Sequence, residues 1–293
     1  MMVTGVYSLL MTPFNRDFSL DEEGLRTLVR FQVKAGVHGL APLGVTGESP
    51  ALTEAEIRRV VEICAEEAKG VCKLAPDTCS CNLDQTIERA KLYAALGADY
   101  AVVFAPFLVK PTQAGLVEFY RRVADSSPIP VIVHNVPDRA GVNIEPKTYA
   151  KLIGHGNIVA TKDGKKELDH LAHVLYLARG TSFGVLTGKD TTAYPLMSFG
   201  GQGVFAVAAN VAPAVMRELV EHCLAGRFDK ARELHYAYYE LFEALRLETN
   251  PMAVKAALSL MGLPGGPLRL PLTPLSPPNR EILGTLLRER GLI

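Results

Sequence analysis

The sequence predicts an α/β fold: a closed (β/α)8 barrel, or TIM barrel, followed by a C-terminal three-helix extension. Eight short apolar runs alternate with eight longer amphipathic segments before the pattern becomes purely helical. No Gly-x-Gly-x-x-Gly turn follows the first run, which argues against an open dinucleotide-binding sheet. The chain has 293 residues, long enough for a barrel of roughly 250 residues with a helical appendix.

Each apolar run is nearly continuous rather than alternating, which is typical of a parallel strand buried on both faces. The predicted strands are residues 6–10, 39–43, 71–75, 100–104, 130–134, 157–162, 182–186 and 203–207.

Start and stop signals of helices bracket the segments between these runs. Thr53 precedes Glu56 by three residues and forms a capping box, and Gly36 and Gly97 follow predicted helix ends. The predicted barrel helices are residues 19–35, 53–69, 82–96, 112–124, 145–153, 166–178, 190–199 and 213–224. Further helices are predicted at residues 228–247, 251–261 and 278–290, with a rigid Pro-rich connector at 264–278. We therefore expect a barrel domain at residues 1–225 and a helical extension at residues 226–293.

Composition excludes several classes of protein. Hydrophobic residues make up 48% and charged residues 21%, which excludes wholesale disorder. Lys plus Arg and Asp plus Glu are 31 each, so the formal net charge is +0. The chain therefore has no overall positive charge that would attract nucleic acid. No apolar run reaches the roughly 20 residues of a membrane span, and the N-terminus lacks the pattern of a secretory leader. Five cysteines, an odd number, predict reduced thiols in a cytoplasmic protein. From the balanced charge and the short apolar runs we expect no binding to nucleic acid or to a membrane.

Working residues of such barrels lie where the strands end. Lys162 ends an otherwise apolar strand, and desolvation there would lower the pKa of its amine, as a Schiff-base lysine requires. The alternative is a lysine that extends to solvent or pairs with Asp163. Lys73, within another apolar run, and Lys189, in a Gly-rich loop that we expect to be more exposed, are competing candidates.

The loops after the second and fifth strands carry further candidates. Gly44-Val45-Thr46-Gly47-Glu48 offers backbone N–H groups and a hydroxyl that suit a carboxylate, or it is a simple turn. Arg139 either clamps a second carboxylate or pairs with a nearby acid. His134 is either an acid/base near neutral pH or a hydrogen-bonded core histidine. Cys79-Ser80-Cys81 has no second cysteine pair and the other histidines form no triad, so we expect no metal.

Taken together and in order, several motifs make the chain recognisable over nearly its whole length. They are Thr12-Pro13-Phe14, Gly44-Val45-Thr46-Gly47-Glu48-Ser49, Asn135-Val136-Pro137-Asp138-Arg139-Ala140-Gly141, Lys162-Asp163, Gly200-Gly201-Gln202-Gly203-Val204, Asn250-Pro251-Met252-Ala253-Val254-Lys255 and Leu268-Arg269-Leu270-Pro271-Leu272-Thr273-Pro274. The chain resembles the dihydrodipicolinate synthase / N-acetylneuraminate lyase family of class I aldolases. The resemblance implies the barrel with its helical extension, a homotetramer built as a dimer of dimers, and no metal or organic cofactor.

The resemblance also implies roles for individual residues. Lys162 would form an imine with pyruvate or another 2-oxo acid, and the imine would act as the electron sink for making or breaking a carbon–carbon bond with an aldehyde. The implied substrate-binding residues are Val45, Thr46, Gly47, Arg139 and Val204, of which Val204 would line the pocket with its backbone.

The chain departs from the synthase branch at the three positions of a proton relay. A tyrosine, a threonine and a tyrosine of the neighbouring subunit are replaced by His134, Val45 and Leu108. Val45 and Leu108 carry no transferable proton, so only His134 can serve as an acid/base. Two enzymatic functions follow: 4-hydroxy-tetrahydrodipicolinate synthesis, by family resemblance, and aldol cleavage of 2-oxo-3-deoxy sugar acids. A non-catalytic homologue that binds a 2-oxo acid is the alternative.

Overall fold

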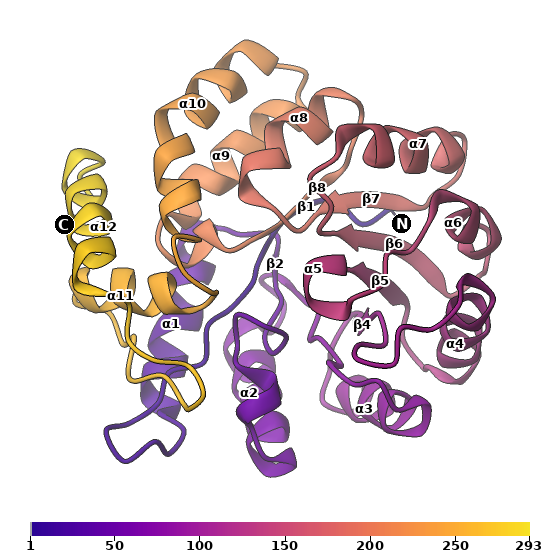
Figure 1. The fold of residues 1–293 in the computed structure, drawn as a ribbon, viewed down its shortest axis with the longest axis horizontal. Coiled ribbons are helices and arrows are strands. Elements are labelled where there is room, and N and C mark those ends of the chain that lie inside the picture. The colour runs from indigo at the N-terminus through magenta and orange to yellow at the C-terminus, as the bar shows by residue number, and fades with distance from the viewer. Residues whose placement is uncertain (1) are drawn as a thin grey trace.

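The computed structural model describes residues 2–293 and contains the predicted barrel (Figure 1). The strands form one parallel sheet in the order β3-β2-β1-β8-β7-β6-β5-β4. Its two ends meet where Asp77 makes a parallel bridge with Val102, and the Thr78 amide donates to the Val102 carbonyl at 2.8 Å. The strands are β1 (Gly5–Ser8), β2 (Gly39–Leu40), β3 (Lys73–Leu74), β4 (Ala101–Phe104), β5 (Val131–Asn135), β6 (Ile158–Asp163), β7 (Gly184–Thr187) and β8 (Gly203–Ala206).

Helices cover the outside of the barrel, and their predicted caps are present. Thr53 and Glu56 make both halves of the capping box, and Gly36 is left-handed at φ 76°. The covering helices are α1 (Glu22–Ala35), α2 (Glu54–Ala68), α3 (Leu83–Ala95), α4 (Gln113–Ser126), α6 (Pro146–Leu152), α7 (Leu168–Ala178), α8 (Ala193–Ser198) and α9 (Pro213–Leu224). Short elements that the sequence did not predict are the 3-10 helices η1 (Ser49–Ala51) and η3 (Ala208–Asn210) and the helix α5 (Pro137–Ala140). The segment predicted as one helix at 190–199 is divided into the 3-10 helix η2 (Asp190–Thr192) and α8.

Three helices follow the barrel: α10 (Phe228–Ala244), α11 (Met252–Leu260) and α12 (Pro277–Glu289). α10 packs on α9, and α12 packs on α10 and α11 at the left edge of Figure 1. None of the helices within residues 2–293 combines the length and the hydrophobicity that a bilayer span needs.

Both faces of the sheet are buried, which explains the continuous apolar runs. In β5, Ile132 belongs to one apolar cluster together with Ala160 and Phe205 of other strands, whereas Val131 and Val133 belong to a second cluster with residues of α4, α6 and α7. Because side chains alternate along a strand, His134 faces the same side as Ile132. Strand periodicity therefore carries a titratable side chain into the barrel interior.

Candidate active site

Lys162 lies inside the barrel for the same reason. Ala160, two residues earlier in β6, belongs to the same apolar cluster as Ile132 and Phe205. The Lys162 side chain is 6% exposed, and its Nζ lies 5.6 Å from the centre of the Phe205 ring on β8. It lines a cavity of about 330 Å³ among the loops that follow the strands. Burial disfavours the ammonium form and lowers the pKa of Lys162 to about 8.

Asp163, the next residue, does not pair with Lys162. Its carboxylate accepts hydrogen bonds from Asn135 Nδ2 at 3.0 Å, the Tyr149 hydroxyl at 2.8 Å and His170 Nε2 at 3.0 Å. These contacts lie on the outer side of β6 and fix the end of that strand against its neighbours. The alternative pairing considered for Lys162 is therefore not present.

A buried carboxylate–imidazole pair lies beside Lys162. His134 Nδ1 is 2.7 Å from Asp77 Oδ2. Lys162 Nζ is 3.7 Å from the same carboxylate oxygen and 3.5 Å from His134 Nδ1. Asp77 comes from the loop after β3, at the point where its backbone closes the barrel. The sequence analysis did not identify Asp77, although its place just beyond a strand end is the signal that singled out the other candidates.

The electrostatics of this pair favour one protonation state. Burial would raise the pKa of Asp77, but the charges and hydrogen bond of His134 and Lys162 outweigh it and lower that pKa. Burial, followed by the charge of Lys162, lowers the pKa of His134 to about 4. Near neutral pH the carboxylate is therefore ionised and the imidazole is neutral. We infer that Nδ1 carries the proton donated to Asp77, while Nε2, without a hydrogen-bond partner among residues 2–293, keeps its lone pair.

The loop after β2 presents backbone N–H groups beside this centre. Leu43 and Glu48 adopt left-handed conformations, with φ of 68° and 51°, so the chain turns sharply. Three successive amides in the turn donate to no acceptor within residues 2–293; they are those of Val45, Thr46 and Gly47. Thr46 Oγ1 accepts from Asn250 Nδ2 at 2.9 Å, which leaves its own proton available. Such a run of free donors suits a carboxylate.

The C-terminal helices hold this strained turn in place. Glu48 forms a buried ion pair with Lys255 of α11 at 2.6 Å, and its second oxygen accepts from the Arg269 amide at 3.1 Å. The Phe14 ring packs 4.2 Å from Lys255 Nζ. These buried contacts at both carboxylate oxygens hold Glu48 in its left-handed backbone conformation, which would otherwise be unfavourable.

The remaining predicted residues fall at different distances from the cavity. Arg139, on α5, lines it and donates from Nη2 to Thr249 Oγ1 at 2.9 Å. Gly47 lies behind the turn, where an added Cβ would come within 2.9 Å of the Leu43 backbone. The Val204 side chain is fully buried, and Val207 lines the cavity. Strand alternation turns the Phe205 side chain toward Lys162, and lining by the Val204 backbone stays a prediction.

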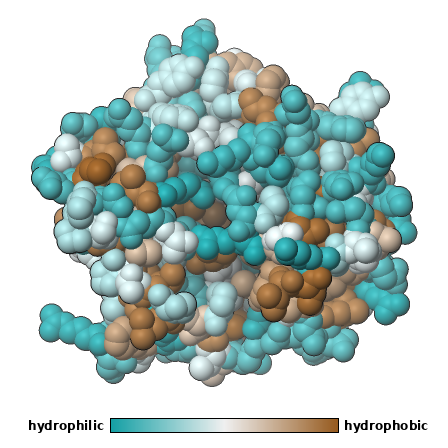
Figure 2. Space-filling view, viewed as in Figure 1, coloured by the Kyte–Doolittle hydropathy of each residue, from teal (hydrophilic) through white to brown (hydrophobic). Residues whose placement is uncertain are grey.

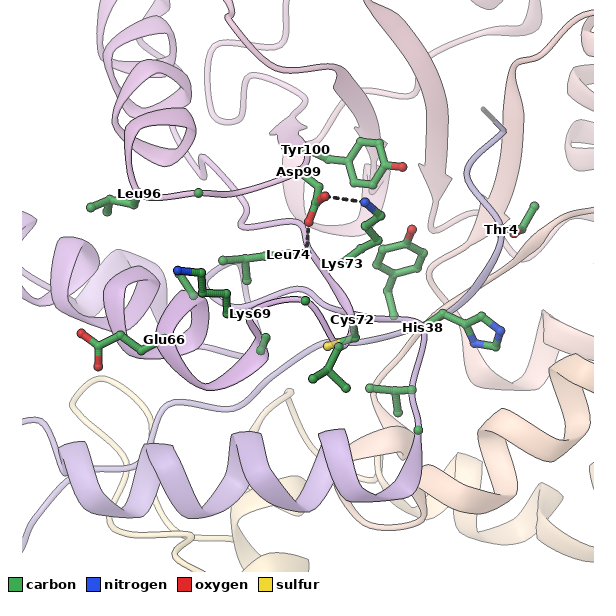
Figure 3. Close-up of a pocket in the computed structure, with 18 of the residues that line it drawn as sticks. Thr4, His38, Glu66, Lys69, Cys72, Lys73, Leu74, Leu96, Asp99 and Tyr100 are labelled. Atoms are coloured by element: carbon green, nitrogen blue, oxygen red, sulfur yellow. Dashed lines mark hydrogen bonds and ion pairs between the residues drawn. The ribbon is translucent and has the colours of Figure 1, made fainter.

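The two competing lysines lie in contrasting environments. Lys73 begins β3, is 47% exposed and pairs with Asp99 at 2.6 Å in a separate cavity of about 880 Å³, at the opposite end of the strands (Figure 3). Lys189 is 7% exposed and lines the same cavity as Lys162, so the expectation of an exposed side chain is wrong. This loop lies close to the Lys162 side chain: a Cβ at Gly188 would make an ordinary contact with Lys162 Cε at 3.7 Å.

A lysine of lowered pKa, buried beside an acid/base pair where the strands of a (β/α)8 barrel end, defines a barrel aldolase or lyase. Comparison with known proteins agrees. Residues 2–290 match the model of the dihydrodipicolinate synthetase family. The chain belongs to this family, and it is an enzyme of the class I aldolase type.

Named relatives are similar over their full lengths. The 4-hydroxy-tetrahydrodipicolinate synthase of Methanospirillum hungatei is 40% identical over 288 residues, covering 98% of this chain and 99% of that protein. The enzyme of the same name from Methanocaldococcus jannaschii is 38% identical and covers 100% of both chains. The crystal structure of dihydrodipicolinate synthase from Thermotoga maritima gives a TM-score of 0.97 at 37% identity over 100% of both chains. The resemblance stated from the sequence is confirmed.

Proposed function

We propose that Lys162 forms an imine with pyruvate or a closely related 2-oxo acid, and that the enzyme joins it to an aldehyde or releases it from the adduct. The observation that carries this proposal is the Lys162 amine, buried in the cavity within 3.7 Å of the Asp77–His134 pair. With a pKa of about 8, about one-tenth of this amine is neutral at pH 7, without an external base.

The residues around Lys162 have distinct parts in this reaction. Thr46 and the free amides beside it hold the carboxylate of the 2-oxo acid. The neutral amine adds to the keto carbon, and His134 Nε2 transfers the two protons of the attacking nitrogen, one after the other, to the keto oxygen, which leaves as water to give the imine. Nε2 then moves a proton from the adjacent methyl group to the imine nitrogen to give the enamine. Enamine attack on the aldehyde forms the new bond, the aldehyde oxygen takes a proton, and water releases Lys162.

Asp77 acts through His134. A buried carboxylate at Nδ1 selects the tautomer with a free Nε2 and stabilises the imidazolium when it forms. This pair takes over the task of the family's proton relay, whose positions are Val45, Leu108 and His134 here. The pair places a group that can accept and return protons beside Lys162, so we favour an enzyme over a non-catalytic binding homologue.

Borohydride reduction tests the proposal directly. Pyruvate and borohydride together should attach the reduced adduct to Lys162, identified by peptide mapping, and Lys162→Ala should abolish it. Lys73→Ala is the matched control, because Lys73 lies at the other end of the strands and should leave labelling unchanged. Labelling that persists in Lys162→Ala, or none in the native chain, would overturn the proposal.

We also propose that the subunits assemble as a homotetramer, a dimer of dimers. Exposed apolar residues support self-association: Leu108 is 84% exposed with a left-handed φ of 69°, and Val109 and Leu270 are also exposed. Leu270 lines a cavity together with Phe107, the residue before Leu108. Figure 2 shows several separate apolar areas on one face of the molecule, with hydrophilic side chains between them. Sedimentation velocity measures the assembly directly, and a monomer at micromolar concentration would contradict the proposal.

The extension is proposed to be part of the catalytic unit rather than an independent module. Asn250, beyond the barrel segment 1–225, bonds to Thr46, and Lys255 anchors Glu48. Deletion of residues 226–293 should therefore abolish labelling of Lys162. We further propose a cytoplasmic location, supported by the five free thiols.

A further inference from the structure

Four cationic side chains converge on the outer part of the Lys162 cavity from four separate segments. Arg139 stands on α5, Lys166 follows β6, Lys189 follows β7, and Arg246 follows α10. Segments far apart in the sequence thus bring like charges to one small cavity, beside the amine proposed to carry the 2-oxo acid. Like charges repel one another, so such a grouping is stable only where anions balance it.

The chain's own acids balance this grouping incompletely. Arg139 and Lys166 have no carboxylate within 4.0 Å among residues 2–293. The one partner of Lys189 is Asp138, at 3.1 Å, whose side chain is 66% exposed. Solvent screening makes a pair with so exposed a carboxylate weak.

The acid nearest Arg246, Asp190, is fully buried, and its Oδ1 accepts from the Ala208 amide at 3.1 Å. Arg246 Nη2 donates to the Gly188 carbonyl at 3.2 Å and lies 3.9 Å from Asp190 Oδ2, beyond hydrogen-bond range. Glu248 lines the cavity, but its Oε1 accepts from Ser276 Oγ at 2.5 Å and from Asn279 Nδ2 at 2.8 Å. The Glu248 carboxylate is therefore hydrogen-bonded to the C-terminal segment rather than paired with the cations of the cavity.

Lys189 is the most informative member of the cluster. It is 7% exposed, and burial together with the charges of Arg246 and Lys166 lowers its pKa, while Asp138 raises it. Packing alone gives no reason for an ammonium here, since an apolar side chain would fill the space without desolvation cost. A ligand anion explains both its burial and its neighbours.

We propose that Lys189, Arg246, Lys166 and Arg139 bind the phosphate group of a phosphorylated hydroxyaldehyde, the second substrate of the reaction proposed above. This inference rests on the proposed function and specifies its substrate class. A phosphate offers two negative charges and three terminal oxygens to donors from several directions, and it accepts the arginine fork in two bonds. A single carboxylate would leave part of the cluster unbalanced, and the ammonium of an amino-aldehyde would be repelled by it.

The position of the cluster fits this chemistry. Lys162 and the four cations line one cavity of about 330 Å³. A phosphate at the cluster and an aldehyde carbon at the enamine therefore fit within one short molecule. The enamine carbon forms the new bond to the aldehyde carbon, and the aldehyde oxygen takes up a proton. The phosphate ester of the substrate stays intact throughout.

A matched pair of aldehydes tests the proposal. With pyruvate as co-substrate, kcat/KM for glyceraldehyde 3-phosphate should exceed that for glyceraldehyde by roughly 100-fold or more, the value of two charge-assisted contacts. Lys189→Met and Lys166→Met should each reduce this ratio by roughly tenfold or more. Asp138→Asn should raise it, because the competing anion is removed; a merely structural Lys189–Asp138 pair would not produce this gain. Lys91→Met is the matched control, a lysine paired with exposed Glu88 on α3, and should leave the ratio unchanged.

Failure of this inference is distinguishable from failure of the proposed function. Borohydride labelling of Lys162 by pyruvate needs no aldehyde, so its absence would overturn the proposed function. Normal labelling combined with equal kcat/KM for the two aldehydes would overturn the phosphate site alone. Faster turnover of an amino-aldehyde or a carboxylated aldehyde than of the phosphorylated one would overturn it as well. Lys166 is exposed, so its variant tests the site even where Lys189→Met folds poorly.

Discussion

Replacing Asp77 with Asn tests whether one carboxylate controls both buried bases. The substitution removes a negative charge 3.7 Å from Lys162 Nζ while keeping the volume of the side chain. At an effective dielectric constant of about 20, the attraction across that distance is about 4 kcal/mol, or about three pH units. The charge of Asp77 raises the pKa of Lys162, so its loss lowers the pH at which the amine becomes neutral. We expect the midpoint for adduct formation to fall below 8 by about one to three pH units.

The same variant should slow turnover. An Asn amide can donate to Nδ1 and select the other tautomer of His134, so we expect a loss of roughly 10²–10⁴-fold. The assay is the rate of borohydride-trapped adduct as a function of pH, together with steady-state turnover of pyruvate. Asp99→Asn is the matched control, because it breaks a similar Lys–Asp contact, to Lys73, outside the cavity. A folded Asp77→Asn protein with an unchanged midpoint and native turnover would refute the reasoning.

Three further substitutions probe separate parts of the structure. His134→Phe should slow formation of the imine by roughly 10²–10⁴-fold with little change in the KM for pyruvate, and an unchanged rate would assign the protons to another group. Thr46→Val removes the hydroxyl bonded to Asn250 and should raise the KM for pyruvate about tenfold in initial-rate measurements; an equal KM would exclude this hydroxyl from carboxylate binding. The hydrogen bond from Arg269 lowers the pKa of Glu56 from 4.5 to about 2. Because the folded pKa is lowered, this stabilisation is present above about pH 4.5 and lost as pH falls toward 2, so Glu56→Gln should cost about 2 kcal/mol at neutral pH and flatten the acid limb of urea denaturation.

Much of the fold follows from local patterns. The continuous apolar runs reflect a sheet covered on both faces, and the Thr53–Glu56 capping box needs only four neighbouring residues. The differences have a physical cause as well. The segment predicted as one helix at 190–199 begins as the 3-10 helix η2, where the Asp190 carboxylate accepts from the Ala208 amide in the loop after the neighbouring strand β8. That bond joins loops distant in sequence and leaves no local signal.

Some residues of the candidate site could likewise be predicted from local sequence, whereas others depend on contacts between distant segments. Lys162, His134, Thr46 and Arg139 stand at strand ends, and the polarity change there is visible in the sequence. The role of Asp77 depends on a contact with His134, 57 residues away along the chain, and Pro76 beside it is typical of an ordinary turn. The burial of Lys189 likewise depends on how its loop folds against β6. Position at a strand end therefore identifies candidate site residues in the sequence. Which of these residues contact one another is decided only when the barrel closes.

The location of the acid/base pair has a consequence for assembly. In the family's relay one tyrosine comes from the neighbouring subunit, whereas Leu108 at that position is 84% exposed and lines no part of the Lys162 cavity. Asp77, His134 and Lys162 come from one chain and contact one another in its interior. Catalysis should therefore not need a partner's side chain. We expect Leu108→Asp to weaken self-association, because it places a charge in an apolar contact, while turnover per chain stays near that of the native enzyme. Sedimentation velocity and pyruvate turnover at the same protein concentration decide this. Loss of activity in parallel with dissociation would show that the interface contributes to the chemistry.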